Sequence, residues 1–241
     1  MNTSRTLKRI TLVLFPVLTL IFAAIYLFNE PLYLESLKED NLVEWLTFIF
    51  LFTSGILSLI TAIRIKSRYN YFHWFFIAFF AFNLLAGFEE ISWGQRVLNI
   101  QSGEFFQRYN DQQETNLHNT FQGVFHIKTK HIALLALFIY GVVLPWMIRR
   151  NALNTRWMDK NFIVIPPSSL MLGFLFATLM MLDFQTGYEE EIGEFYFSIC
   201  FFLFTSYSLI QASETEAFAL KIYSKRDAIR PSFKAKAQMA S

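Results

Sequence analysis

Residues 71–92 read YFHWFFIAFFAFNLLAGFEEIS, and this stretch decides the fold. Positions 74–88 carry no charged side chain, and Asn83 is the one amide among them. A helix needs about 20 consecutive, mostly apolar residues to cross the hydrocarbon core of a bilayer. The stretch is too long for a barrel strand and does not alternate polar with apolar residues. It therefore predicts a transmembrane helix.

Five further stretches of the chain have the same character. The six candidate spans are 10–28, 43–63, 71–92, 131–148, 163–182 and 194–210. The chain of 241 residues is 54% hydrophobic and 17% charged, whereas a soluble domain has about 45–50% apolar and about 25% charged residues. A soluble helical bundle is disfavoured because such helices have no polar face to present to water. The sequence predicts an all-α integral membrane bundle of six transmembrane helices.

The spans also divide the chain into parts. Residues 1–210 are expected to form the transmembrane domain with an outer loop at 93–130, and residues 211–241 to form a basic cytoplasmic tail. The first span is interpreted as a retained helix because the Asn29-Glu30-Pro31 that follows it does not resemble a signal-peptide cleavage site.

Lysines and arginines are sorted between alternate segments. Sixteen of the 21 lie in the N-terminus, the tail, and loops 64–70 and 149–161. The other five lie in two of the intervening loops, 29–42 and 93–130, and the third intervening loop, 183–193, contains no lysine or arginine. Because cytoplasmic loops of membrane proteins carry the basic excess, both termini are expected to be cytoplasmic.

Several classes of function are disfavoured by what the sequence lacks. A single cysteine, Cys200, excludes a disulfide framework and a cysteine-rich zinc site. The net charge of +2 excludes the basic excess of a nucleic-acid-binding protein, so no nucleic acid is expected as a partner. No P-loop and no G-x-S-x-G motif is present, which disfavours ATP-driven work and α/β-hydrolase chemistry.

Acidic residues gather at the predicted outer face. Glu90 follows Asn83 by seven positions, so the two side chains share one stripe of a helix. A carboxylate at membrane depth is costly and usually faces the interior of the bundle. Glu90 is therefore the first candidate for a catalytic or metal-binding residue, and Glu89 is a second catalytic candidate. A purely structural role at the headgroup level stays open for both.

Other candidate ligands follow in the outer segments. Glu114 and His118 are four positions apart, so a helix would place both on one face, where they can bind a metal or act as an acid–base pair. Asp183 ends the fifth span, and Glu194 lies deepest in the sixth. The predicted metal ligands are Glu90, Glu114, His118, Asp183 and Glu194, with a divalent metal such as zinc as the candidate cofactor. The predicted catalytic residues are Glu90, His118 and Glu89.

The same acids allow two other interpretations. Stacked carboxylates in a low-dielectric environment can relay protons. They can also form an inert, hydrogen-bonded plug at the end of the bundle. For the acids at the start of the sixth span, the helix macrodipole alone is a sufficient explanation.

Two motifs carry a resemblance to known proteins. Residues 89–96, EEISWGQR, and residues 116–119, NLHN, resemble the signatures of a group of uncharacterised bacterial multi-pass membrane proteins. This resemblance implies a bacterial inner (cytoplasmic) membrane setting and no assigned activity. A looser similarity links the chain to alkaline-ceramidase-like membrane hydrolases, which are helical bundles with a zinc site. The chain departs from that group because its last span lacks the H-x-x-x-H pair and it has six spans instead of seven.

Three functions remain open on these observations. The first is a metal-dependent hydrolase or transferase that acts on a lipid or lipid-linked substrate at the outer face. The second is a proton-coupled transporter of small solutes. The third is a non-catalytic membrane subunit that binds a partner through loop 93–130.

Overall fold

The protein is described here by a computed structural model. The structure describes residues 3–38, 41–70, 72–95, 98, 101–104, 106, 129–153, 158, 163–182, 184 and 186–214. Over these residues the chain is all-α and contains no strand, as the sequence predicts. The longer helices are α1 (Thr3–Phe28), α2 (Glu30–Leu37), α3 (Leu42–Tyr69), α4 (Trp74–Glu90), α7 (Thr129–Phe138), α10 (Met171–Met180) and α11 (Glu189–Glu214). The shorter ones are η1 (Ser92–Gly94), the π-helix η2 (Ile139–Val143), α8 (Leu144–Arg149) and η3 (Ser168–Leu170).

Four of the described helices are long and apolar enough to cross a membrane: Thr3–Phe28, Leu42–Arg68, His131–Arg149 and Glu189–Ser213. The other two expected spans form shorter apolar helices. The segment Ser168–Met180 is one of them. The other is α4, whose 17 residues reach only the lower end of the range of about 17–25 for a bilayer-spanning helix. The helical character of all six stretches is confirmed, and six complete crossings stay a prediction.

Several helix ends differ from the expected boundaries. The first helix begins at Thr3 and includes the basic residues expected to precede it. The last helix begins at Glu189, five positions before the expected start, because three acidic residues in its first turn complement the helix macrodipole. It ends at Glu214, so the expected tail begins inside this helix, and most of 93–130 and of the tail lie outside the described residues.

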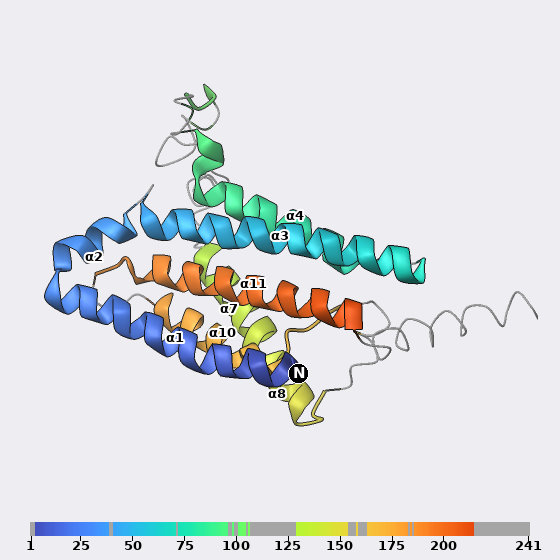
Figure 1. Cartoon of the computed structure of the whole chain (residues 1–241). Helices are drawn as coiled ribbons and strands as arrows, with labels where there is room; N and C mark the ends of the chain where they lie inside the picture. Colours follow the sequence, from blue (N-terminus) through green and yellow to red (C-terminus); the bar gives the residue numbers. More distant parts are fainter. Residues whose placement is uncertain are drawn as a thin grey trace, which may run out of the picture.

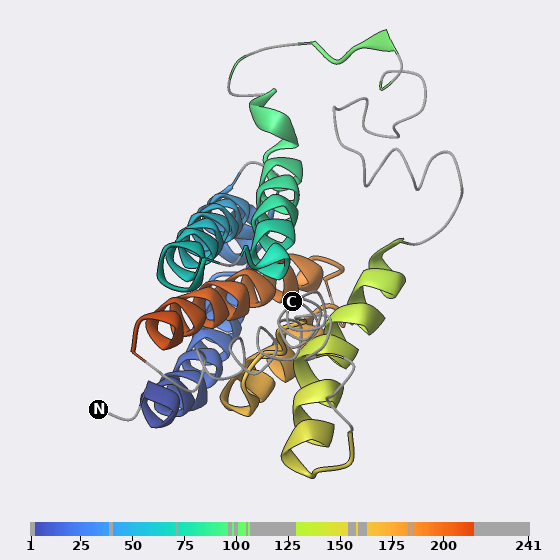
Figure 2. The ribbon, with the colours of Figure 1, turned by 90° about the vertical axis from the view of Figure 1, so that its right-hand side faces the viewer.

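Helix α11 forms the centre of the bundle. It packs most extensively against α3 and then against α10, while α4 lies along α3. Figure 1 shows α3 and α4 side by side above α11, with α1 below it, and Figure 2 shows the same order nearly end-on. Phenylalanines also join α4 to α11. The ring of Phe79 on α4 meets those of Phe201 and Phe204 on α11 edge-on, at centroid distances of 5.3 and 5.5 Å. Such edge-to-face pairs are a favoured arrangement of buried aromatic rings.

Small residues let α10 approach its neighbours. A Cβ atom on Gly173 would collide with the ring of Phe15 on α1 and lie 2.8 Å from Sγ of Cys200 on α11. Ala177, one turn later, is fully buried. The small residues of Gly173-x-x-x-Ala177 thereby allow close packing of the helices.

Polar side chains tie the helices together inside the apolar bundle. Ser58 of α3 donates a hydrogen bond to the carbonyl of Phe76 at 2.8 Å, and the hydroxyls of Thr19 and Tyr196 lie 3.1 Å apart between α1 and α11. Near the C-terminal end of α11, the guanidinium of Arg68 on α3 donates a hydrogen bond to the carbonyl of Ser213 at 2.7 Å. This contact satisfies a carbonyl that a helix C-terminus leaves without an intrahelical partner.

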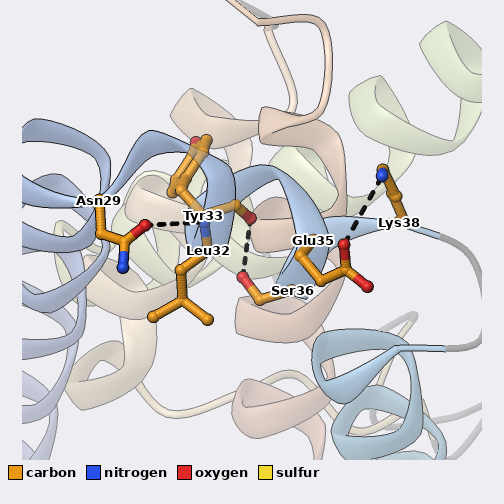
Figure 3. A network of polar contacts seen from close by, with 6 residues as sticks. All are labelled: Asn29, Leu32, Tyr33, Glu35, Ser36 and Lys38. Carbon is orange, nitrogen blue, oxygen red and sulfur yellow. Dashed lines mark hydrogen bonds and ion pairs between the residues drawn. The ribbon is translucent and has the colours of Figure 1, made fainter.

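A short helix, α2, turns the chain between α1 and α3, within a segment expected to be a loop (Figure 3). Asn29 starts it, because its side-chain oxygen accepts a hydrogen bond from the amide of Leu32 at 3.2 Å. An ion pair of 3.7 Å between Lys38 and Glu35 lies at its other end. The helix thereby holds the buried side chain of Tyr33 toward the bundle.

The outer surface of the bundle is apolar. On α1, Val13, Leu20 and Leu27 are 63%, 68% and 75% exposed, and Ile132 on α7 is 62% exposed. A water-soluble protein rarely exposes apolar surface of this extent. The exposed faces of these helices therefore fit contact with lipid.

Candidate functional site

Three glutamates converge at one end of the bundle. One carboxylate oxygen from each of Glu90, Glu191 and Glu194 lies within 4.8 Å of the others, and all three side chains are partly buried. Glu90 ends α4, whereas Glu191 and Glu194 lie in the first turns of α11. The structure therefore brings together two residues predicted as metal ligands, Glu90 and Glu194, and adds Glu191.

Helix periodicity explains why these residues meet. Glu191 and Glu194 are three positions apart and share one face of α11. On α4, Asn83 and Gly87 are buried toward α3 on the stripe that ends in Glu90. A Cβ atom on Gly87 would lie 3.4 Å from the side chains of Leu51 and Phe48, so α3 and α4 pack closely just below the cluster.

The electrostatic environment of Glu90 is strongly acidic. Glu194, Glu191, Glu44 and Glu89 all interact with it by charge repulsion. Within the part of the chain that the structure describes, no lysine or arginine forms an ion pair with Glu90. Like charges repel one another at this separation, so a bound cation or a shared proton would lower the electrostatic free energy of the cluster.

Glu89 takes a different role from its neighbour. Its carboxylate accepts a hydrogen bond of 2.7 Å from the indole Nε1 of Trp93, and the indole stacks on Phe88 at a centroid distance of 5.5 Å. Ser92 and Trp93 both have a left-handed backbone, with φ of 45° and 57°. Such strained residues cluster at functional sites, and these two directly follow the helix that ends in Glu90.

The remaining predicted site residues lie outside the described residues: Glu114, His118 and Asp183. Their predicted roles as ligands stay predictions. Glu191 was not among the predicted ligands, since the run Glu189-Glu190-Glu191 does not by itself indicate which acid shares a face with Glu194. The spacing of three residues between Glu191 and Glu194 was the available signal.

Glu189 lies on the opposite side of the first turn of α11. Its carboxylate accepts hydrogen bonds from the amide and hydroxyl of Thr186, at 3.0 and 2.9 Å, and from the amide of Gly187 at 3.1 Å. The sequence T-x-x-E at 186–189 is typical of a helix start and could have indicated this contact. Burial and, to a lesser degree, the negative charge of Glu189 raise the pKa of the Tyr33 phenol on α2.

The first turns of α11 thus separate two polar environments. Glu191 and Glu194 face the acid at the end of α4, and Glu189 faces α1 and α2.

In comparisons with known proteins, no family model, no curated protein and no solved structure matches this chain.

Proposed function

We propose that this protein is a multi-pass membrane enzyme that uses a divalent metal ion to hydrolyse a lipid or lipid-linked substrate or to transfer a group from it. The observation that supports the proposal is the convergence of Glu90, Glu191 and Glu194 at one end of an apolar helical bundle. An inner-membrane location and a six-span topology belong to the same proposal.

The donor set favours a hard cation. All three described donors are carboxylate oxygens, which suit Mg²⁺, Mn²⁺ or Ca²⁺. Two oxygens on opposite sides of a Ca²⁺ ion at about 2.4 Å each are about 4.8 Å apart, and the three carboxylate oxygens lie within 4.8 Å of one another. A zinc site would need an imidazole such as that of His118.

The residues around the cluster have defined tasks in this proposal. A bound metal supplies a Lewis acid and an activated water molecule. Glu90, Glu191 and Glu194 hold it, and the apolar side chains of α3 and α4 exclude bulk water from one side. The stacked pair Phe88 and Trp93, with Trp93 41% exposed, offers an aromatic surface of the kind found at the membrane interface.

Metal analysis of the purified full chain tests the proposal. The wild type, dialysed against Ca²⁺, Mn²⁺ or Zn²⁺, is expected to retain about one ion per chain at this cluster of ligands. Glu90→Gln and Glu194→Gln are expected to lose the ion, whereas Glu190→Gln, which removes a charge from the same helix outside the cluster, should keep it. His118→Ala tests whether the imidazole belongs to the site.

Activity is measured in parallel as release of water-soluble product from labelled membrane lipids. Product is expected from the metal-loaded wild type and from Glu190→Gln, and not from Glu90→Gln. A wild type that binds none of the three metals, or a Glu90→Gln variant with undiminished product release, would contradict the proposal.

One observation favours proton-coupled transport as the second candidate. Asn83 is fully buried on the Glu90 stripe, and its side-chain oxygen has no hydrogen-bond partner among the described residues. An intramembrane polar group on the same helix stripe as an acid is a common feature of proton pathways. Acidification of proteoliposomes on addition of a solute, abolished by Glu90→Gln in the absence of any bound metal, would support this candidate over the enzyme.

A further inference from the structure

A second polar environment lies in a pocket on the other side of the first turn of α11. The pocket has a volume of about 160 Å³ and lies between α1, α2, α10 and α11. Five of its ten described lining residues are aromatic, namely Phe22, Tyr26, Tyr33, Phe184 and Tyr196, and Glu189 is the acid among the ten. The described part of the lining is therefore rich in aromatic rings and includes the carboxylate of Glu189.

The aromatic side chains come from three helices and the segment before α11. The rings of Tyr26 and Tyr33 meet at a centroid distance of 5.2 Å and an angle of 64°. Those of Phe22 and Tyr196 meet at 6.4 Å and 54°. The rings in each pair are inclined to one another and do not form a flat stack.

Glu189 gives this pocket a buried negative charge. Its side chain is 6% exposed, and three donors from Thr186 and Gly187 fix the position of its carboxylate. No described lysine or arginine forms an ion pair with it. A buried carboxylate without a paired cation is unfavourable unless its surroundings or a ligand compensate the charge.

We propose that this pocket binds an organic ammonium ion. Aromatic rings beside a carboxylate are the chemistry that recognises alkylated ammonium groups, since the ring faces and the carboxylate attract the cation while the rings contact its methyl or methylene groups. Cavities of about 150 Å³ can hold a benzene-sized molecule, so an ethanolamine or choline group fits the available space. The ammonium ion comes either from a phospholipid headgroup or from a small free amine.

Other ligands fit this pocket less well. An anion would be repelled by Glu189, and a hard metal ion needs six or so oxygen ligands, which an aromatic lining does not supply. A lipid acyl chain would gain nothing from a buried carboxylate. The proposal does not depend on metal binding at Glu90, because Glu189, Ile192 and Tyr196 line this pocket and Glu191 and Glu194 belong to the other site.

Calorimetric titration of the full chain in detergent tests the proposal with two probes of equal shape. Choline carries the cation, and 3,3-dimethyl-1-butanol replaces its nitrogen by carbon. Choline is expected to bind about tenfold more tightly than the neutral probe, the difference that a partly desolvated cation–aromatic contact makes. Equal affinity for both probes would overturn the proposal.

Three variants assign the binding to this pocket. Glu189→Gln and Tyr26→Leu are both expected to weaken choline binding about tenfold, and Glu190→Gln, on the same turn but outside the pocket, should leave it unchanged. Tyr26→Leu keeps the carboxylate and its hydrogen bonds, so it remains informative if Glu189→Gln fails to fold. Undiminished binding in Tyr26→Leu, or an equal loss in Glu190→Gln, would overturn the proposal.

Native mass spectrometry from mixed vesicles distinguishes the two sources of the ammonium group. Preferential retention of phosphatidylethanolamine over phosphatidylglycerol by the wild type, lost in Tyr26→Leu, identifies a lipid headgroup. Choline binding without any lipid preference identifies a free amine. Neither choline binding nor a lipid preference would overturn the proposal and leave the metal site at Glu90 untouched.

Discussion

Carboxylate oxygens of Glu90 and Glu194 lie within 4.8 Å of one another, although one residue ends α4 and the other lies near the start of α11. Glu191 completes the group, and Glu44 and Glu89 add further negative charge around Glu90. Since like charges at this separation repel, binding of a cation or a proton would lower the electrostatic free energy of the cluster.

Removing one charge from the cluster should stabilise the metal-free protein. In buffer with a chelator, we expect Glu90→Gln to raise the thermal unfolding midpoint, because a repulsion of about 1 kcal/mol is relieved. In Ca²⁺ the order should reverse, since the wild type gains stability from binding and the variant does not. Glu190→Gln, outside the cluster, should show no such reversal, and a lower midpoint for Glu90→Gln with chelator present would refute the repulsion.

Trp93 is expected to stabilise the turn after α4 through two separable contacts. Trp93→Phe keeps an aromatic ring for the stack on Phe88 and loses the Nε1 hydrogen bond to Glu89, which should cost about 1 kcal/mol of unfolding free energy. Trp93→Ala should cost more because the ring stack is lost as well. Equal losses in the two variants, measured by thermal unfolding, would mean that the stack contributes nothing.

Gly173 should tolerate no large side chain. Gly173→Leu is expected to destabilise the protein by about 1–3 kcal/mol or to prevent its folding, because the new atoms would collide with Phe15 and Cys200. Gly103→Leu is the matched control, since no described atom beyond its chain neighbours lies within 4 Å of the new Cβ position there. Thermal unfolding and the yield of monodisperse protein in detergent measure the difference.

Arg68 is expected to hold the last turn of α11 in place. Arg68→Ala removes the hydrogen bond to the Ser213 carbonyl and should cost about 1 kcal/mol, most visibly as faster amide hydrogen exchange in residues 209–213. Lys8→Ala, an exposed basic residue on α1, is the control. Unchanged exchange in Arg68→Ala would indicate that water satisfies the same carbonyls equally well.

The predicted orientation can be tested with single cysteines. Cys200 is fully buried and should give little background labelling. In intact cells, a membrane-impermeant thiol reagent should label Lys38→Cys, in the predicted outer segment, and not Lys66→Cys. Both substituted positions are exposed, so accessibility within the protein is matched. Labelling of Lys66→Cys in intact cells would contradict the orientation.

Much of the fold could be predicted from local properties of the chain. Long apolar stretches with at most one charged residue form the central parts of α1, α3 and α11, because a helix is the structure that satisfies its own backbone hydrogen bonds in an apolar environment. The Gly173-x-x-x-Ala177 pattern and the Asn83–Glu90 stripe could also be recognised in the sequence, since both follow from helix periodicity. Helix α2 was missed because its eight residues lack the length and apolar character of a span.

The candidate site was predictable only in part. Glu90 could be predicted as a site residue because a carboxylate at the end of an apolar helix is unusual. Its partners Glu191 and Glu194 depend on the rotation of α11 relative to α4, which no local pattern encodes. The same rotation directs Glu189, two positions before Glu191, into an aromatic pocket built from α1 and α2.

The sequence by itself determined the all-α class, the membrane-length helices and the acidic character of one end of the bundle. These properties depend on composition and on the helical repeat, which act over a few turns of chain. Only the tertiary structure decided which acids meet and which are kept apart. That outcome depends on how α11 packs against α3 and α10, where close contacts between phenylalanines and small residues set the rotation of each helix.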